Sequence, residues 1–191
     1  SSFVLRSSAA VDHIGQILLA EGLVFAGDRV ASFLPMAHAY GFEHAFLAPV
    51  MAGACVEVLG AFSIDRAAEA IARGAMTMPL VPAAASALAH AEIPAGALRS
   101  CTVAGASLPP AVRAAFQQAR GIPLVDLYGA TELGTIWLDR GAGGVPVAGG
   151  VLVAGGVLVG AVAGALVGAA SASLQGSAAR VKARTEQVVR A

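Results

Sequence analysis

The chain has 191 residues, of which 57% are apolar and 13% charged, and its formal net charge is zero. This length is enough for one good hydrophobic core, so we expect one domain with an appendage. Residues 1–140 hold eight basic and eleven acidic side chains, whereas residues 141–191 hold four basic and one acidic. The resulting balances of −3 and +3 do not indicate a nucleic-acid-binding surface.

The two cysteines, Cys55 and Cys101, lie in apolar runs without Cys-x-x-Cys or Cys/His spacing. This pattern argues against a metal site or a disulfide framework, and we interpret both as buried free thiols. The N-terminal Ser-Ser-Phe-Val-Leu-Arg contains no basic segment followed by a long apolar stretch. Because that pattern marks secretory signals, we expect a cytoplasmic protein.

Helical and strand patterns alternate between residues 8 and 127, with turn signals between them. This alternation is typical of an α/β fold, in which helices flank a mostly parallel sheet. In chain order, the pattern predicts a helix over residues 9–21, a strand over 29–34, a helix over 41–51, a strand over 55–59, a helix over 64–72, a strand over 76–81, a helix from Pro82, a strand over 100–104, a helix over 109–119 and a strand over 124–127.

Three loops follow predicted strands, at residues 34–41, 104–110 and 128–132. Ligands of such sheets bind beyond the carboxyl ends of the strands, so we expect the three loops to open at one rim. Chemically the third loop is the richest. The hydroxyl of Thr131 can donate to a phosphate oxygen, and the carboxylate of Glu132 can hold a magnesium ion.

Each loop also has a structural alternative. Thr131 and Glu132 suit the start of a helix, where a threonine caps the first turn and a carboxylate favours the positive end of the dipole. His38 can hydrogen-bond a substrate or exchange a proton, since the unperturbed pKa of histidine is about 6.5, but a packed structural histidine is the alternative. The turn at residues 105–107 can pass close to a flat ring or simply connect a strand to a helix.

Together the loops resemble the adenylate-forming superfamily, which includes acyl-CoA synthetases, 4-coumarate–CoA ligases, luciferases and peptide-synthetase adenylation domains. Leu34 to Gly41 is similar to the family's Leu-Pro-x-x-His-x-x-Gly segment. Gly105 to Pro110 resembles a glycine-containing turn with its common continuation, and Tyr128 to Glu132 resembles the Tyr-Gly-x-Thr-Glu signature. The resemblance implies an α/β fold, that of part of the large adenylate-forming domain.

On the acid side, the resemblance implies that His38 borders the acyl pocket and takes part in catalysis. The segment that begins with Gly41 and Phe42 resembles the helix that lines the acyl tunnel. Phe42 and Phe46 suit a hydrophobic acid, as in fatty acid metabolism, but Glu43 and the histidine after it stand among these apolar residues.

On the nucleotide side, the resemblance implies that four residues lie along the adenine: Gly105, Ala106, Ser107 and Tyr128. It also implies that Gly129 lies by the acyl carbonyl, that Thr131 binds the AMP phosphate and that Glu132 binds magnesium. Gly129 lets a ligand approach the backbone closely.

The reaction implied by this resemblance joins a carboxylic acid to a thiol. The acid attacks the α-phosphate of ATP, pyrophosphate leaves, and the acyl group passes from AMP to a thiol, usually that of coenzyme A. The resemblance covers roughly residues 3–150. The family's phosphate loop ending in Pro-Lys-Gly, its ribose-binding Thr-Gly-Asp and its catalytic lysine have no counterpart in the sequence. We therefore expect a truncated ligase that is inactive alone.

The C-terminal third differs in composition from the rest. Residues 141–179 carry no charge, and the sequence Val-Ala-Gly-Gly-Val-Leu occurs at residues 147–152 and again at 153–158. Glycines at positions 156, 160, 164 and 168 recur every fourth residue, a spacing that allows close helix contact in a membrane. We therefore divide the chain into an α/β domain over residues 1–140, a Gly/Ala/Val-rich apolar segment over 141–179 and a basic polar tail over 180–191.

Three interpretations of the apolar segment stay open. In the first, it is a membrane-associated or oligomerising helix, with membrane contact through residues 151–172, because an apolar run of about 20 residues can span a bilayer. In the second, it is a glycine-rich strand or helix packed on the domain. In the third, it is an aberrant, chimeric terminus. The first interpretation gives an alternative function, that of a non-catalytic membrane-associated or self-associating protein.

Overall fold

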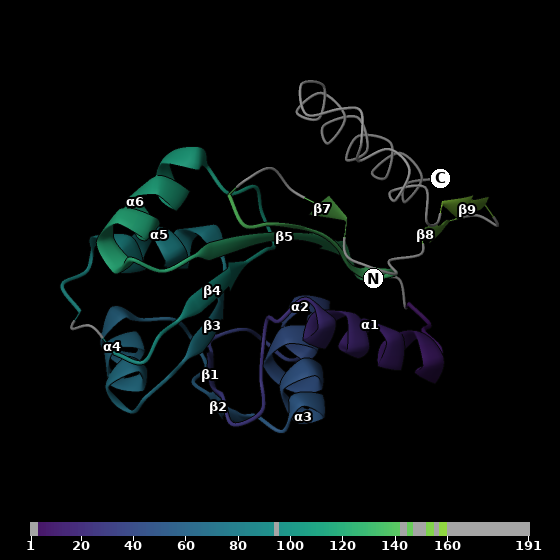
Figure 1. The fold of residues 1–191 in the computed structure, drawn as a ribbon, viewed down its shortest axis with the longest axis horizontal. Coiled ribbons are helices and arrows are strands. Elements are labelled where there is room, and N and C mark those ends of the chain that lie inside the picture. Colours follow the sequence, from purple (N-terminus) through teal and green to yellow (C-terminus); the bar gives the residue numbers. More distant parts are fainter. Residues whose placement is uncertain (1–3, 94–95, 142–144, 147–151, 155–156, 160–191) are drawn as a thin grey trace.

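The computed structural model describes residues 4–93, 96–141, 145–146, 152–154 and 157–159 (Figure 1). The helical elements are α1 (Ser8–Ala20), α2 (Ala39–Phe42), the π-helix η1 (Glu43–Leu47), α3 (Ala48–Ala52), α4 (Ile64–Ala72), α5 (Pro82–His90) and α6 (Pro110–Arg120). The strands are β1 (Arg29–Ser32), β2 (Cys55–Val58), β3 (Thr77–Leu80), β4 (Ser100–Val103), β5 (Leu124–Ala130), β6 (Gly134–Asp139), β7 (Val145–Pro146), β8 (Leu152–Ala154) and β9 (Val157–Val159).

Within the described residues, seven strands form one sheet in the order β2-β1-β3-β4-β5-β6-β7. Strands β1 to β5 pair in parallel, whereas β6 is antiparallel to both β5 and β7. Strands β8 and β9 form a separate antiparallel pair. The predicted α/β class, with a mostly parallel sheet flanked by helices, is therefore confirmed.

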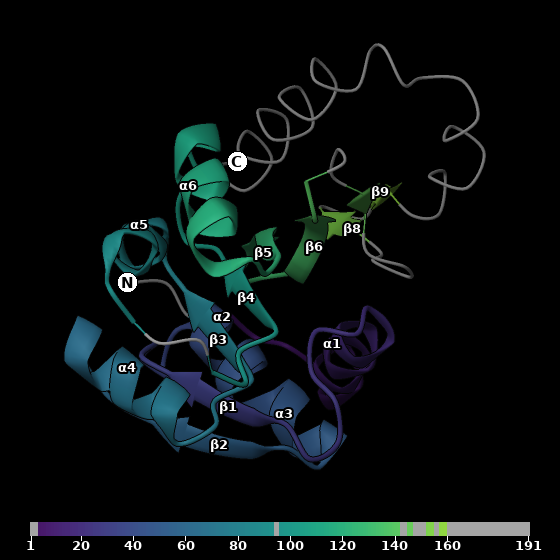
Figure 2. The same ribbon diagram turned by 60° about the vertical axis from the view of Figure 1, so that its left-hand side comes forward.

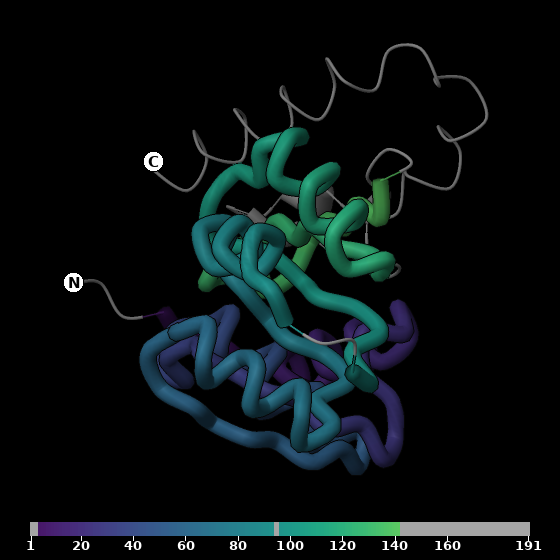
Figure 3. Tube along the Cα trace, turned by 90° about the vertical axis from the view of Figure 1, so that its left-hand side faces the viewer, coloured from purple at the N-terminus to yellow at the C-terminus, as the bar shows by residue number. Residues whose placement is uncertain are grey.

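Helices cover both faces of the sheet (Figures 1 and 2). Helices α4, α5 and α6, which lie toward the viewer in Figure 3, enclose one core that contains Met78, Leu88 and Phe116. Helix α1 and the α2–η1–α3 segment enclose a second core, which contains Leu18 and Val125. Two cores form because successive side chains of a strand point to opposite faces of the sheet.

The helix predicted over residues 41–51 is three elements, α2, η1 and α3. In η1 the backbone follows the wider π pattern, and the N–H of Ala48 donates to the carbonyl of Glu43. Gly53, with a φ of 73°, then ends the segment in the left-handed region. The apolar spacing that predicted one helix is compatible with both patterns, so the prediction of a single regular helix was wrong in this detail.

The region predicted as a loop at residues 128–132 is largely strand. Strand β5 continues to Ala130, residues 131–133 form a turn, and β6 returns antiparallel to β5. The alternative of a helix that starts at Thr131 is therefore wrong. Strand β6, which was not among the predicted elements, supplies the hydrogen-bonding partner that keeps Tyr128 and Gly129 extended.

The two cysteines have different environments. Cys101 lies in the central strand β4, where it is buried, and burial raises the pKa of its thiol to about 12. Cys55 is exposed, which corrects the prediction of a buried thiol. The physical reason is the position of β2 at the edge of the sheet, beside β1 alone.

Most of the C-terminal third lies outside the described residues, including the four regularly spaced glycines and the tail over residues 180–191. Within the segment 151–172, the structure describes only the residues of β8 and β9. Among the residues it describes, there is no helix whose length and apolar character would let it cross a membrane.

Candidate active site

A cavity of about 790 Å³ opens at the carboxyl ends of β1, β4 and β5. Its wall is formed by side chains and backbone from four stretches of the chain: His38, Ala39, Tyr40 and Glu43; Ala104 to Leu108; Asp126 to Glu132; and Gly134 to Trp137. Each of the three loops expected to share a rim contributes to this wall. They meet because the strands before them are parallel and end at the same edge.

His38 is exposed at the cavity and caps helix α2. Its Nδ1 atom accepts a hydrogen bond from the backbone N–H of Tyr40 at 3.3 Å. Since Nδ1 acts as an acceptor, the neutral imidazole carries its proton on Nε2. The ring is thus both a structural cap and a donor available at the cavity wall.

The turn at residues 105–107 follows β4 directly and is exposed. Gly105 has a φ of 88°, in the left-handed region that favours glycine, and the nearest atom to an added Cβ would be a Val81 methyl at 3.8 Å. The glycine is therefore required by backbone conformation rather than by crowding. It turns the chain so that Ala106 and Ser107 face the cavity.

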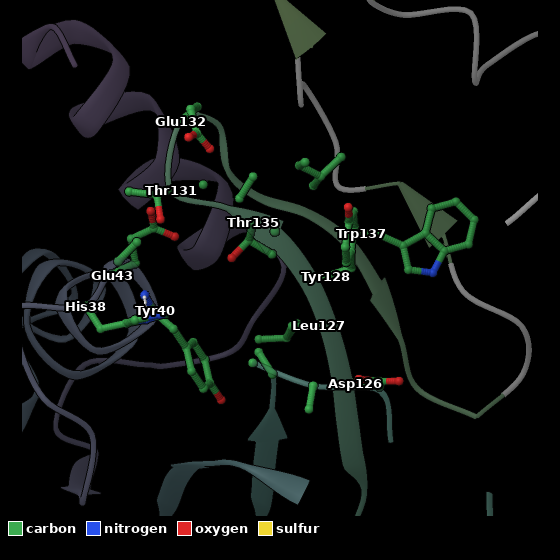
Figure 4. Close-up of a pocket in the computed structure, with 18 of the residues that line it drawn as sticks. His38, Tyr40, Glu43, Asp126, Leu127, Tyr128, Thr131, Glu132, Thr135 and Trp137 are labelled. Carbon is green, nitrogen blue, oxygen red and sulfur yellow. Dashed lines mark hydrogen bonds between the residues drawn. The ribbon is translucent and has the colours of Figure 1, made fainter. Parts of the chain in front are cut away.

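The β5–β6 hairpin places Tyr128 and Gly129 in the cavity wall and Thr131 and Glu132, both exposed, at its tip. In Figure 4 these two tip residues lie toward the upper left and Trp137 lies at the right. The pairing register shifts between Tyr128 and Gly129, a bulge of the kind that re-aims side chains next to active sites. A Cβ at position 129 would lie 2.5 Å from the carbonyl oxygen of Gly134, so the hairpin itself requires a glycine there.

Two residues expected at the acid side, Gly41 and Phe42, are not part of the cavity wall. Gly41 is buried, and a Cβ there would come 2.1 Å from the carbonyl oxygen of Pro35, so it closes the preceding loop. The ring of Phe42 packs against that of Phe46, with centroids 5.9 Å apart. The aromatic residues that suggested a hydrophobic acid therefore contact each other instead of lining the cavity.

Sequence reasoning missed several residues of the wall, of which Tyr40 is one. Its hydroxyl is 3.0 Å from the hydroxyl of Thr102 on β4, and both side chains are buried. Burial raises the pKa of Tyr40 well above its usual value, so the phenol stays protonated and joins α2 to the sheet. The sequence signal that could have identified Tyr40 was its position two residues after His38, within the same loop.

Glu43 is the second missed residue, and it carries a charge in the buried part of the wall. Its side chain is 3% exposed, and its Oε1 atom accepts from the Arg6 guanidinium at 2.7 Å. Burial raises the pKa of Glu43, while hydrogen bonds from Arg6 and Thr135 oppose the shift. The next residue, His44, is 3.0 Å from the Thr135 hydroxyl, and burial lowers its pKa to about 3. The signal was this polar pair within an apolar run.

The residues at the hairpin tip suit magnesium that arrives with a nucleotide. Magnesium in such sites keeps several waters and takes one or two carboxylates together with substrate phosphates. Glu132 offers one exposed carboxylate beside the Thr131 hydroxyl. Across the described residues, no group of three or more histidine, cysteine or acidic side chains is placed to hold a metal ion by itself. Glu132 can thus supply one carboxylate to a cation whose other ligands come from elsewhere.

The sequence matches the family model of the AMP-binding enzymes over residues 5–160. This match spans most of the chain, and it follows the same elements that build the cavity. The chain therefore belongs to the AMP-binding enzyme family.

One similar protein of known activity is the sulfoacetate–CoA ligase of Cupriavidus necator, 34% identical over 109 residues. The alignment covers 55% of this chain and 21% of that ligase. Two similar solved structures are ATP-bound MatB from Rhodopseudomonas palustris and a benzoate CoA ligase from Burkholderia xenovorans LB400. Both are 22% identical, with TM-scores of 0.69 and 0.66, and each match covers 76% of this chain.

The match covers 31% of MatB and 33% of the benzoate ligase. The chain thus spans about a fifth of the curated relative and about a third of these solved structures. Together the comparisons show an AMP-binding enzyme family member whose fold is shared with the matched part of these ligases.

Proposed function

We propose that this chain forms the acid- and AMP-binding part of an ATP-dependent, AMP-forming acid–thiol ligase. The observation that carries the proposal is the convergence of three segments, at residues 38–43, 104–108 and 126–132, on one cavity. They are far apart in the sequence, but parallel strands bring their ends to one rim. A rim of this kind is where α/β sheets bind ligands.

In this proposal the nucleotide lies across the middle of the cavity. Tyr128 and the turn at residues 105–107 hold the adenine, because Tyr128 offers a flat ring to the cavity and the turn offers exposed backbone. The Thr131 hydroxyl donates to the AMP phosphate, and the Glu132 carboxylate holds Mg²⁺. When bound, the magnesium ion would offset negative charge on the phosphate oxygens. Charged groups that are already in place before the reaction stabilise the transition state of phosphoryl transfer and so lower its activation barrier.

The acid lies between His38 and Gly129 in the same proposal. The Nε2–H of His38 is the donor on this side, since Nδ1 already accepts from the backbone. Gly129 leaves its backbone exposed toward the acyl carbonyl. We propose coenzyme A as the thiol, since the curated relative and several solved relatives are named as CoA ligases.

Binding of AMP to the 191-residue chain tests the proposal directly. Trp137 is the only tryptophan in the sequence and lies in the cavity wall, so its fluorescence reports occupancy. We expect a saturable change with AMP in the presence of Mg²⁺. The variant Trp137→Phe should lose the signal. A flat titration, checked by calorimetry, would contradict the proposed AMP site.

The chain alone is proposed to bind without completing adenylation, because its sequence has no counterpart of the family's catalytic lysine and phosphate loop. Exchange of labelled pyrophosphate into ATP measures this step. We expect none with any carboxylic acid, and clear exchange would show that the chain is sufficient for catalysis.

A further inference from the structure

A buried polar network, two of whose residues line the cavity, joins three parts of the chain. Arg6, in the segment before α1, pairs with Glu43 of η1 at 2.7 Å, and the Arg6 side chain is 13% exposed. His44, the next residue of η1, is 3.0 Å from the hydroxyl of Thr135 on β6. Glu43 and Thr135 both line the cavity wall.

Both polar residues belong to the π-helix η1. A π turn is wider than an α turn and is found mostly as short segments, frequently at functional sites. Glu43 and His44 are the first two residues of η1, and both are buried. Burying a glutamate and a histidine is costly unless both are hydrogen-bonded. Their partners, Arg6 and Thr135, satisfy this requirement.

Thr135 lies at the base of the hairpin tip. It is the register partner of Gly129, beside the β5 bulge, and only Gly134 separates it from the turn at residues 131–133. The turn is also packed from below, because a Cβ at Gly134 would lie 2.6 Å from Ile14 and 3.3 Å from Arg6. Arg6 Nη2, the atom that pairs with Glu43, therefore also lies close to the backbone that supports the turn.

We propose that Glu43 is a positioning residue that acts through Arg6: together with the His44–Thr135 contact, the Glu43–Arg6 ion pair holds the hairpin so that Thr131 and Glu132 face the cavity. The inference rests on the proposed function, in which this turn receives the AMP phosphate and Mg²⁺. Glu43 itself touches neither group. Its role is to fix the strand from which the turn projects.

The decisive variant is Glu43→Gln, which keeps the shape of the side chain and removes its charge. Its matched control is Glu57→Gln, which breaks the Glu57–Arg73 ion pair on the edge strand β2, away from the cavity wall. Amide hydrogen exchange over residues 131–135 and titrations with AMP and adenosine, followed by Trp137 fluorescence, are measured on all three proteins.

Glu43→Gln loses a charge-assisted hydrogen bond. The rate of amide exchange in the turn should therefore rise about tenfold, and the affinity for AMP should fall about tenfold. Adenosine lacks the phosphate, so its affinity should change less than about twofold by the same reasoning. Glu57→Gln should behave like the natural chain. Equal weakening of AMP and adenosine would indicate general destabilisation and overturn the proposal, as would unchanged exchange in the turn.

A second pair of variants covers the case in which Glu43→Gln does not fold. Thr135→Val removes the hydroxyl that joins η1 to β6, whereas Thr135→Ser keeps it. Exchange in the turn should rise in the valine variant and remain protected in the serine variant; equal protection in both would overturn the proposal. If the natural chain binds neither AMP nor adenosine, the proposed function fails, and the exchange data alone decide whether Glu43 positions the turn.

Discussion

Replacement of Gly134 by alanine should destabilise the fold more than the same change at other left-handed glycines. Gly134 has a φ of 75°, and an added Cβ would lie 2.6 Å from Ile14 Cδ1, 2.9 Å from Ile14 Cγ1 and 3.3 Å from Arg6 Nη2. The left-handed conformation costs about 1 kcal/mol for a residue with a Cβ. Overpacking against a buried helix adds about 1–3 kcal/mol.

The matched control is Gly121→Ala, because Gly121 has a φ of 68° and no atom within 4 Å of an added Cβ. Only the conformational cost of about 1 kcal/mol applies there. Urea unfolding of both variants and of the natural chain, followed by circular dichroism, gives the two free-energy differences. Equal losses for Gly134→Ala and Gly121→Ala would refute the view that α1 and Arg6 pack directly beneath the hairpin.

Three further predictions concern the cavity and its wall. Thr131→Ala should weaken AMP binding about tenfold and leave adenosine binding nearly unchanged, as judged by Trp137 fluorescence. Tyr40→Phe should lower the free energy of unfolding by about 1 kcal/mol, since it leaves the buried Thr102 hydroxyl without this partner; a urea midpoint equal to that of the natural chain would contradict it. Burial lowers the pKa of His44 to about 3, so between pH 6.5 and 3 the unfolded chain binds a proton that the folded chain does not. The stability of the natural chain relative to His44→Gln should therefore fall by about 2 kcal/mol from pH 7 to pH 5, and a constant difference would be inconsistent with a neutral buried imidazole.

Local signals predicted most of the fold. Helix α4 has the bounds that its amphipathic pattern predicted, and Ala67, Ala70 and Ile71 are buried at helical spacing. The structure adds a cap, since Ser63 Oγ accepts from the backbone N–H of Arg66. A cap and an apolar stripe are both encoded within a dozen residues. The same is true of the buried strands, whose apolar runs end at proline or glycine signals.

Features that depend on distant partners were not predictable in this way. The extension of β5 to Ala130 needs β6 alongside it, and nothing within residues 128–132 specifies that pairing. The exposure of Cys55 depends on the strand order, which places β2 at an edge. The π pattern of η1 was not predicted because the apolar spacing of this segment is compatible with both a π-helix and an α-helix.

The residues of the candidate site also divide into those that local signals predicted and those that depend on distant partners. His38, the turn after β4 and the hairpin residues were recognised from short motifs, and the structure brings them to one cavity. Arg6 and Glu43 were not recognised as partners because 37 positions separate them, and no short motif contains both. The sequence signal for this contact was a pair of polar side chains within an apolar run.

Strand β5 joins two kinds of pairing, parallel with β4 and antiparallel with β6. Because side chains alternate along a strand, inserting one residue between Leu124 and Tyr128 would turn the following side chains to the opposite face. Leu127 would leave its core, and the hairpin tip would shift out of register with the other two loops. Among natural homologues, the number of residues from the start of β5 to Thr131 should therefore stay constant.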